Sequence, residues 1–228
     1  DERHRKKVME HFEFNEGTRK LGGNGDKGDK EEAWESEELD KEEAKVFRGL
    51  AARLNFLSLD CPDLQFPTKG CAREMAKPTR GSWNEMKKLA RYLVGRKRVL
   101  WEFRWQDEPK YARVFGDSDW GGSKKDREST SGGVWMLGEH CIKTWSCSQG
   151  AYALSSAEAE LYAMVEATCR AKGLRNLALE VGFGELSNVV KLGTDSSAAK
   201  SFVSRKGLGR MRHLEIRDLW LQKEVAEG

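Results

Sequence analysis

The sequence predicts a mixed α/β (α+β) domain preceded by a small helical unit. The first observation is a change of hydrophobic period near residue 100, from helical spacing before it to alternation after it. The second is a long amphipathic segment, with clear start and stop signals, that follows several short strand-like segments. Strands and helices in this order are typical of helices packed on one mixed sheet.

The composition fits a folded chain with a modest core. Of its 228 residues, 38% are hydrophobic and 34% are charged, and the formal net charge is +3. No apolar run approaches the roughly 20 residues that span a membrane, so we expect no membrane partner. The five cysteines lack zinc-finger spacing and indicate reduced thiols in an intracellular protein, of the cytoplasm or nucleus.

Composition shifts divide the chain into three parts. Residues 1–40 are expected to be partly disordered, with a short helix over 1–16 before an acidic, glycine-rich tether. Residues 41–98 are predicted to form the helical unit. Residues 99–228 are predicted to form the α/β domain.

Three helices with short connections are predicted in the helical unit. Apolar residues at helical spacing run from Val46 to Leu57, and a second helix is expected over 64–76. The third helix is expected to begin at a capping box, in which the Ser82 hydroxyl and the Glu85 carboxylate bind backbone amides.

The third helix also carries a basic cluster beside Trp83 and Tyr92. Such a cluster can follow a phosphate backbone. An ordinary solvated helix face with long side chains covering apolar surface explains it equally well. The candidates for nucleic-acid contact are Lys87, Lys88 and Arg91, and the cluster continues through Arg96, Lys97 and Arg98.

Short strands are predicted at the start of the α/β domain. Residues 100–105 alternate in polarity and lead into a turn. Further strands are predicted over 111–115, 133–137 and 141–146, and the last two are expected to form a hairpin.

The long helix is predicted to begin at the capping box Ser155 to Glu158 and to end at Gly182. Counted from the strand at 111–115, the fourth strand of the domain then runs from Val189 into Asp195, which is expected to cap a helix. A final helix is predicted from about Arg212.

Three acidic residues fall at the ends of these elements. Counted from the strand at 111–115, Asp117 lies at the end of the first strand, and Asp119 comes two residues later. Asp195 ends the fourth strand. Glu160 lies in the first turns of the long helix. Each acid alone has an ordinary explanation as a turn or cap residue. If the first and fourth strands are neighbours, however, Asp117, Glu160 and Asp195 meet at one sheet edge.

Three crowded carboxylates repel one another and would partly protonate unless a cation joins them. The set contains oxygen ligands only, which favours Mg²⁺ or Mn²⁺ over zinc. Two such ions, about 3.5–4 Å apart, can activate a water and stabilise the leaving oxygen in phosphodiester hydrolysis. No small-molecule cofactor is expected.

Six motifs follow one another from about residue 112 onward. They are GDSDWGG (116–122), RESTSGG (127–133), IKTWSC (142–147), SSAEAELYA (155–163), TDSSAA (194–199) and RHLEIR (212–217). In these motifs the chain resembles the ribonuclease H domain of copia-type retrotransposon Pol polyproteins. Before it, residues 39–44, 54–57, 61–64 and 91–95 resemble the connection segment at the C-terminal end of the reverse transcriptase.

The resemblance implies a ribonuclease H-like fold and metal-dependent cleavage of the RNA strand of an RNA–DNA hybrid. By motif, Asp117, Glu160 and Asp195 would be catalytic and bind metal, with Asp119 as a further ligand. The implied partners are the hybrid and the reverse transcriptase portion of the same polyprotein, inside a retroelement particle. The implied nucleic-acid contacts near the site are Lys124, Lys125, Arg127, Ser155, Ser156 and His213.

The family carries one more strand and helix beyond the equivalent of Gly228, including a fourth metal-binding aspartate. We therefore expect the last strand and helix of the fold to be missing. This motivates an alternative function, a catalytically inactive fragment that only binds nucleic acid. A related nuclease or an integrase on the same fold is a third hypothesis. It is disfavoured because an integrase glutamate usually follows both aspartates.

Overall fold

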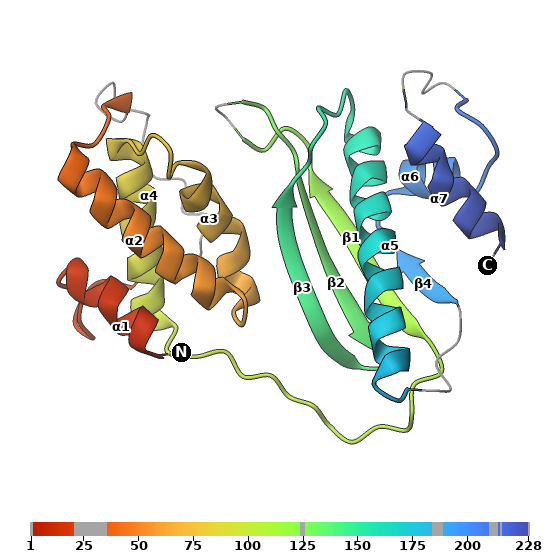
Figure 1. The fold of residues 1–228 in the computed structure, drawn as a ribbon, viewed down its shortest axis with the longest axis horizontal. Helices are drawn as coiled ribbons and strands as arrows, with labels where there is room; N and C mark the ends of the chain where they lie inside the picture. The colour runs from red at the N-terminus through yellow and green to blue at the C-terminus, as the bar shows by residue number, and fades with distance from the viewer. Residues whose placement is uncertain are drawn as a thin grey trace. The chain divides into compact units, whose positions relative to one another are not determined.

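The computed structural model describes residues 2–20, 36–123, 126–183, 189–209, 214 and 216–227. The chain divides into two compact units, Asp1–Trp101 and Glu102–Gly228. The first unit is helical and the second holds the sheet (Figure 1). No helix in the described ranges is long and apolar enough to cross a membrane.

Four helices build the first unit around one hydrophobic core. Phe47, Leu54 and Met86 are fully buried in this core. Val8 joins them, because the first helix packs against the second and fourth. The N-terminal helix is therefore part of the helical core, although residues 1–40 were expected to precede it. The helices are α1 (Glu2–His11), α2 (Lys41–Ser58), α3 (Pro62–Arg73) and α4 (Arg80–Gly95).

The capping box of α4 lies three residues before the predicted one. The Ser82 amide donates to Thr79 Oγ1 at 3.2 Å, and the Thr79 amide donates to Ser82 Oγ at 2.8 Å. Ser82 is thus the third helical residue and Thr79 is the N-cap, so the predicted start was wrong. Thr79 supplies a capping hydroxyl one turn earlier, and Glu85 forms an ion pair with Lys88 instead.

The strand predicted over 100–105 is wrong. Residues 96–111 contain neither helix nor strand. Alternating polarity suits a half-buried strand only where a neighbouring strand and a core are present. Here Trp105 is 94% exposed and Leu100 is 76% exposed, so the apolar side chains have no core to enter.

A four-stranded mixed sheet forms the second unit, in the order β3-β2-β1-β4. β1, β2 and β3 are antiparallel, whereas β4 runs parallel to β1. The predicted hairpin is confirmed, with Gly138 at a φ of 60° in its turn. The predicted proximity of the first and fourth strands is confirmed as well. The strands are β1 (Ala112–Asp119), β2 (Thr130–Leu137), β3 (His140–Ser148) and β4 (Val190–Gly193).

One long helix, α5 (Ser156–Glu180), covers one face of the sheet (Figure 1). Its close approach depends on small residues, since a Cβ at Gly116 of β1 would lie 3.0 Å from the Ala163 carbonyl oxygen. The helix ends two residues before Gly182, whose φ is 110°, as the predicted stop requires. Helices α6 (Ser197–Val203) and α7 (Ile216–Glu227) pack against α5.

The described residues thus contain seven helices and a four-stranded mixed sheet, as expected for an α/β chain with a ribonuclease H-like fold. The parallel pairing of β4 with β1 matters most for function. It brings the C-terminal ends of both strands to one edge of the sheet, where α5 begins.

Candidate metal centre

Three carboxylates meet at this edge of the sheet. Asp117 lies near the end of β1, Asp195 follows β4, and Glu160 comes from the second turn of α5. Each offers one carboxylate oxygen, and these three oxygens lie within 4.8 Å of one another. Asp117 and Asp195 are exposed, so the cluster is open to solvent on one side.

Glu160 is the enclosed member of the cluster. The residue as a whole is half-buried, but its Oε2 atom is covered and has no hydrogen-bond partner among the described residues. Burial raises the pKa of the Glu160 carboxyl, and the negative charges of Asp117 and Asp195 raise it further. Hydrogen bonds from the Ser118 amide and hydroxyl to Oε1, both 3.3 Å, act in the opposite direction.

This environment fits a bound cation. A covered carboxylate oxygen without a donor, beside two further acids, is costly unless a positive charge compensates it. Within the described ranges the cluster contains oxygen ligands and no histidine or cysteine. Asp117, Glu160 and Asp195 could therefore hold a metal ion.

Asp195 is available to this cluster because another residue caps the following helix. The sequence predicted that Asp195 takes part in capping α6. In the structure the N-cap is Ser196, whose hydroxyl accepts a hydrogen bond from the Ala199 amide at 3.2 Å. The Asp195 carboxylate is thus free to face Asp117 and Glu160.

Asp119 lies outside the cluster of three. Its Oδ1 accepts a hydrogen bond from the Thr130 amide, directly across the β1–β2 ladder. Alternation along a strand predicted that Asp117 and Asp119 point the same way. β1 ends at Asp119, however, where the carboxylate bonds to the facing residue of β2 and not to the cluster.

Two positioning residues were missed by the sequence analysis. Ser118 lies between the two aspartates and was not predicted as a site residue. Its main contribution comes from its backbone amide, so the residue type does not reveal this role. The buried Gln149 amide nitrogen donates to Ser131 Oγ at 3.0 Å and to the Ala159 carbonyl at 2.8 Å. It ties the start of α5, and so Glu160, to β2. Gln149 lies three residues beyond the strand predicted over 141–146, so no clear sequence signal marked it.

The start of α5 is held by Ser155 and Glu158. Ser155 Oγ accepts from the Glu158 amide at 3.2 Å, so the predicted N-cap is confirmed. The buried Glu158 carboxylate accepts instead from the Leu154 amide and from the Tyr162 hydroxyl, at 2.9 and 2.6 Å. Glu158 is therefore structural, while Glu160, two residues later, faces the cluster.

The residues predicted to contact nucleic acid near the site are only partly described. Ser156 and Arg127 are exposed, and the Ser155 hydroxyl is engaged as the helix cap. Their contacts with nucleic acid remain predictions. Lys124, Lys125 and His213 lie outside the described residues, as does most of the glycine-rich tether.

The basic cluster of the helical unit has partners within that unit. Lys88 pairs with Glu85 at 2.8 Å, and the Arg91 guanidinium lies 5.8 Å from the centre of the Phe14 ring. Tyr92 is buried. Trp83 packs edge-on against an aromatic neighbour in the core. These contacts favour the solvated-face interpretation, while nucleic-acid contact by Lys87, Lys88 and Arg91 remains a prediction.

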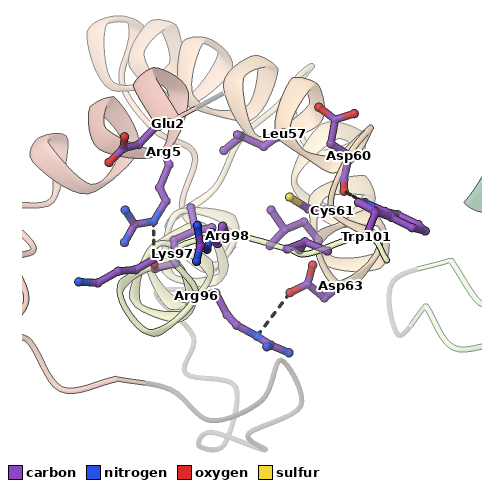
Figure 2. A pocket seen from close by; sticks show the side chains of 13 residues that line it. Glu2, Arg5, Leu57, Asp60, Cys61, Asp63, Arg96, Lys97, Arg98 and Trp101 are labelled. Atoms are coloured by element: carbon purple, nitrogen blue, oxygen red, sulfur yellow. Dashed lines mark hydrogen bonds and ion pairs between the residues drawn. The ribbon is translucent and has the colours of Figure 1, made fainter. Parts of the chain in front are cut away.

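A cavity of about 560 Å³ lies at the end of α4 in the same unit (Figure 2). Arg96 points to Asp63 in an ion pair of 3.7 Å, and Trp101 closes one wall by donating to the Asp60 carbonyl at 3.0 Å. Arg98 and Asp60 also line it. Because both signs of charge are present, the cavity favours no single class of ligand.

Comparison with known proteins relates the chain to Pol polyproteins of transposons. It is 27% identical to the retrovirus-related Pol polyprotein from transposon RE2 of Arabidopsis thaliana, over 183 residues that are 80% of this chain and 12% of the relative. The corresponding protein from transposon RE1 of Arabidopsis thaliana is 26% identical over the same shares. The chain thus spans about an eighth of the length of these relatives.

The secreted RxLR effector protein 161 of Plasmopara viticola is 33% identical over 107 residues, 47% of this chain and 75% of the effector. The name of the effector describes the Plasmopara protein and is not transferred to this chain. No family model matches the chain, and no solved structure matches it significantly. The similarity to the two transposon proteins along four fifths of the chain supports a fragment of a copia-type retrotransposon Pol polyprotein.

Proposed function

We propose that this chain is the ribonuclease H module of a retroelement and cleaves the RNA strand of RNA–DNA hybrids endonucleolytically during reverse transcription. One observation carries the proposal. Three carboxylates from three different elements place oxygens within 4.8 Å of one another, and one of them has a covered oxygen without a donor. Crowded like charges with a covered oxygen among them are costly unless a cation compensates them.

Asp117, Glu160 and Asp195 would hold Mg²⁺, or Mn²⁺, with two ions expected. When bound, these ions supply an activated water and stabilise the leaving 3′-oxygen. The residues of the chain supply the geometry. Ser118 holds the Glu160 carboxylate through two hydrogen bonds of 3.3 Å. Asp117 and Asp195 are exposed, so a phosphate of the RNA backbone can reach them from solvent.

The substrate and the partner follow from the family. A hybrid would be recognised by its shape, its phosphates and its 2′-hydroxyl groups rather than by its base sequence. The relatives are Pol polyproteins by name, which supports a polyprotein context for this chain. In that context we propose that a reverse transcriptase portion of the same polyprotein delivers the hybrid. We place the protein inside the cell, in a retroelement particle or in the nucleus.

The test is cleavage of a labelled RNA–DNA hybrid in Mg²⁺, compared with duplex RNA. The Asp117→Asn and Glu160→Gln variants should each cleave the hybrid more than about 100-fold more slowly than the unmodified protein. This loss exceeds the usual effect of removing a residue that only hydrogen-bonds a metal ligand. Glu166→Gln is a matched control, because Glu166 lies on the same helix and pairs with Arg170 at 2.6 Å. Cleavage that survives Asp117→Asn would refute the assignment. Hybrid binding without cleavage by the unmodified protein would favour a binding-only fragment.

A further inference from the structure

Two consecutive glycines of β2 have different environments. A Cβ at Gly133 would overlap the Trp145 ring and lie 2.7 Å from the Phe115 carbonyl oxygen, so packing alone explains this glycine. A Cβ at Gly132 would have no heavy atom nearer than 3.9 Å. Packing within the unit therefore does not explain Gly132. Glycine within a strand costs stability and often marks the close approach of a ligand.

Gly132 faces the candidate metal centre. It lies directly opposite Asp117 in the β1–β2 register, so side chains at the two positions project from the same face of the sheet. This face is opposite to α5, because Gly116 contacts α5 and Asp117 is its neighbour in the strand. Any side chain at position 132 would stand beside the Asp117 carboxylate.

A recess of about 550 Å³ opens at this place, lined by Asp117, Asp195 and Gly132. Phe115 forms part of its wall and is 40% exposed. The ring can lie toward β4 because Gly193 has no side chain, since a Cβ there would lie 2.5 Å from Phe115 Cδ1. Glycines on both neighbouring strands thus keep the recess open.

The lining of the recess indicates which part of a substrate it accepts. Among the described residues, Asp117 and Asp195 are the charged residues of its lining, and no described lysine or arginine lines it. This described lining offers a phosphate no compensating charge except at the metal centre. Phe115, Val134 and the glycines offer an apolar surface that suits the neutral face of a sugar ring.

We propose that this recess seats the ribose next to the scissile phosphate, and that Gly132 is a positioning residue that keeps the seat open. The inference rests on the proposed ribonuclease H function. A side chain at position 132 would displace the RNA strand from the carboxylates without removing a metal ligand. Displacement of a reacting group by about 1 Å can cost about 100-fold in rate.

The experiment compares Gly132→Ala and Gly132→Val with Gly173→Ala, a control in α5 where a Cβ also meets nothing within 4 Å. We expect kcat/KM for hybrid cleavage to fall modestly with alanine and about 100-fold with valine. The control should match the unmodified protein. Because glycine inside a helix or strand is destabilising relative to alanine, the Tm should not fall in any of the three variants. The increase of the Tm with Mg²⁺ should be retained, whereas a structural defect would lower the Tm. If the valine variant does not fold, the alanine variant carries the test.

Two outcomes separate this inference from the proposed function. If the unmodified protein cleaves the hybrid and Gly132→Val cleaves it equally well, the seat is refuted and the nuclease function stands. If the unmodified protein does not cleave, the nuclease function fails. Hybrid affinity, measured by fluorescence anisotropy with and without Mg²⁺, then decides whether position 132 contacts nucleic acid. Equal affinity of Gly132→Val and the unmodified protein would refute the seat in that case as well.

Discussion

The basic face of the helical unit and the acidic edge of the sheet satisfy their charges differently. On the helical face, Lys88 and Arg96 have acidic partners within the same unit. At the sheet edge, Asp117, Glu160 and Asp195 face one another, and a covered Glu160 oxygen has no partner. Charges that are paired internally contribute little to the argument for a ligand. Like charges that the fold brings together, with a covered oxygen among them, favour a compensating cation.

The largest expected effect concerns metal binding at the acidic edge. Mg²⁺ should raise the Tm of the unmodified protein, since a ligand at 100 times its Kd stabilises the folded state by about 2.7 kcal/mol. Asp195→Asn should abolish this increase, and EDTA should reverse it. Glu85→Gln in the helical unit is the control and should leave it intact. Differential scanning fluorimetry measures the effect. An equal increase of the Tm with Mg²⁺ in Asp195→Asn and in the unmodified protein would contradict metal binding at the acidic edge.

The next largest effect concerns the support of the acidic edge. Gln149→Ala removes two buried hydrogen bonds between β2 and the start of α5. We expect the free energy of unfolding to fall by about 1–3 kcal/mol, the usual range for buried polar groups that lose a partner. Urea denaturation measures the change. A loss below about 0.5 kcal/mol, the level of ordinary surface substitutions, would show that Gln149 does not hold α5 in place.

A smaller effect tests the repulsion within the cluster. Burial and neighbouring charges raise the pKa of Glu160 above its ordinary value of 4.5, so its ionised form weakens the metal-free fold. In EDTA at neutral pH, Glu160→Gln should therefore raise the Tm. The advantage should shrink as the pH falls through the raised pKa and vanish below 4.5. A lower Tm of Glu160→Gln at neutral pH would contradict the raised pKa.

The smallest effect is expected on the basic face. Lys88→Ala breaks an exposed i,i+3 ion pair with Glu85 and should change the free energy of unfolding by no more than about 0.5 kcal/mol. Hybrid binding by this variant, measured against salt concentration, sharpens the comparison. A flatter salt dependence, by about 0.9 for each lost phosphate contact, would return Lys88 to the nucleic-acid contacts.

Much of the candidate site could be predicted from the sequence, because its signals are local. The acids stand where strands end and helices begin, and the topology that unites them follows from parallel pairing of the first and fourth strands of the domain. The failures were also local. Alternation at 100–105 predicted a strand that lacks a partner, and the serine at 82 was taken for the N-cap that Thr79 supplies.

By itself, the sequence determined the element order, the mixed α/β class and the three acids, because period, capping residues and strand ends are properties of short segments. Only the tertiary structure separated Asp117 from Asp119, since the Thr130 amide that engages Asp119 is eleven residues away. It also separated Gly132 from Gly133, two identical residues. Packing against Trp145 occupies the space above one, while the other borders an open recess. Such differences arise from neighbours that are distant in sequence, which no local pattern records.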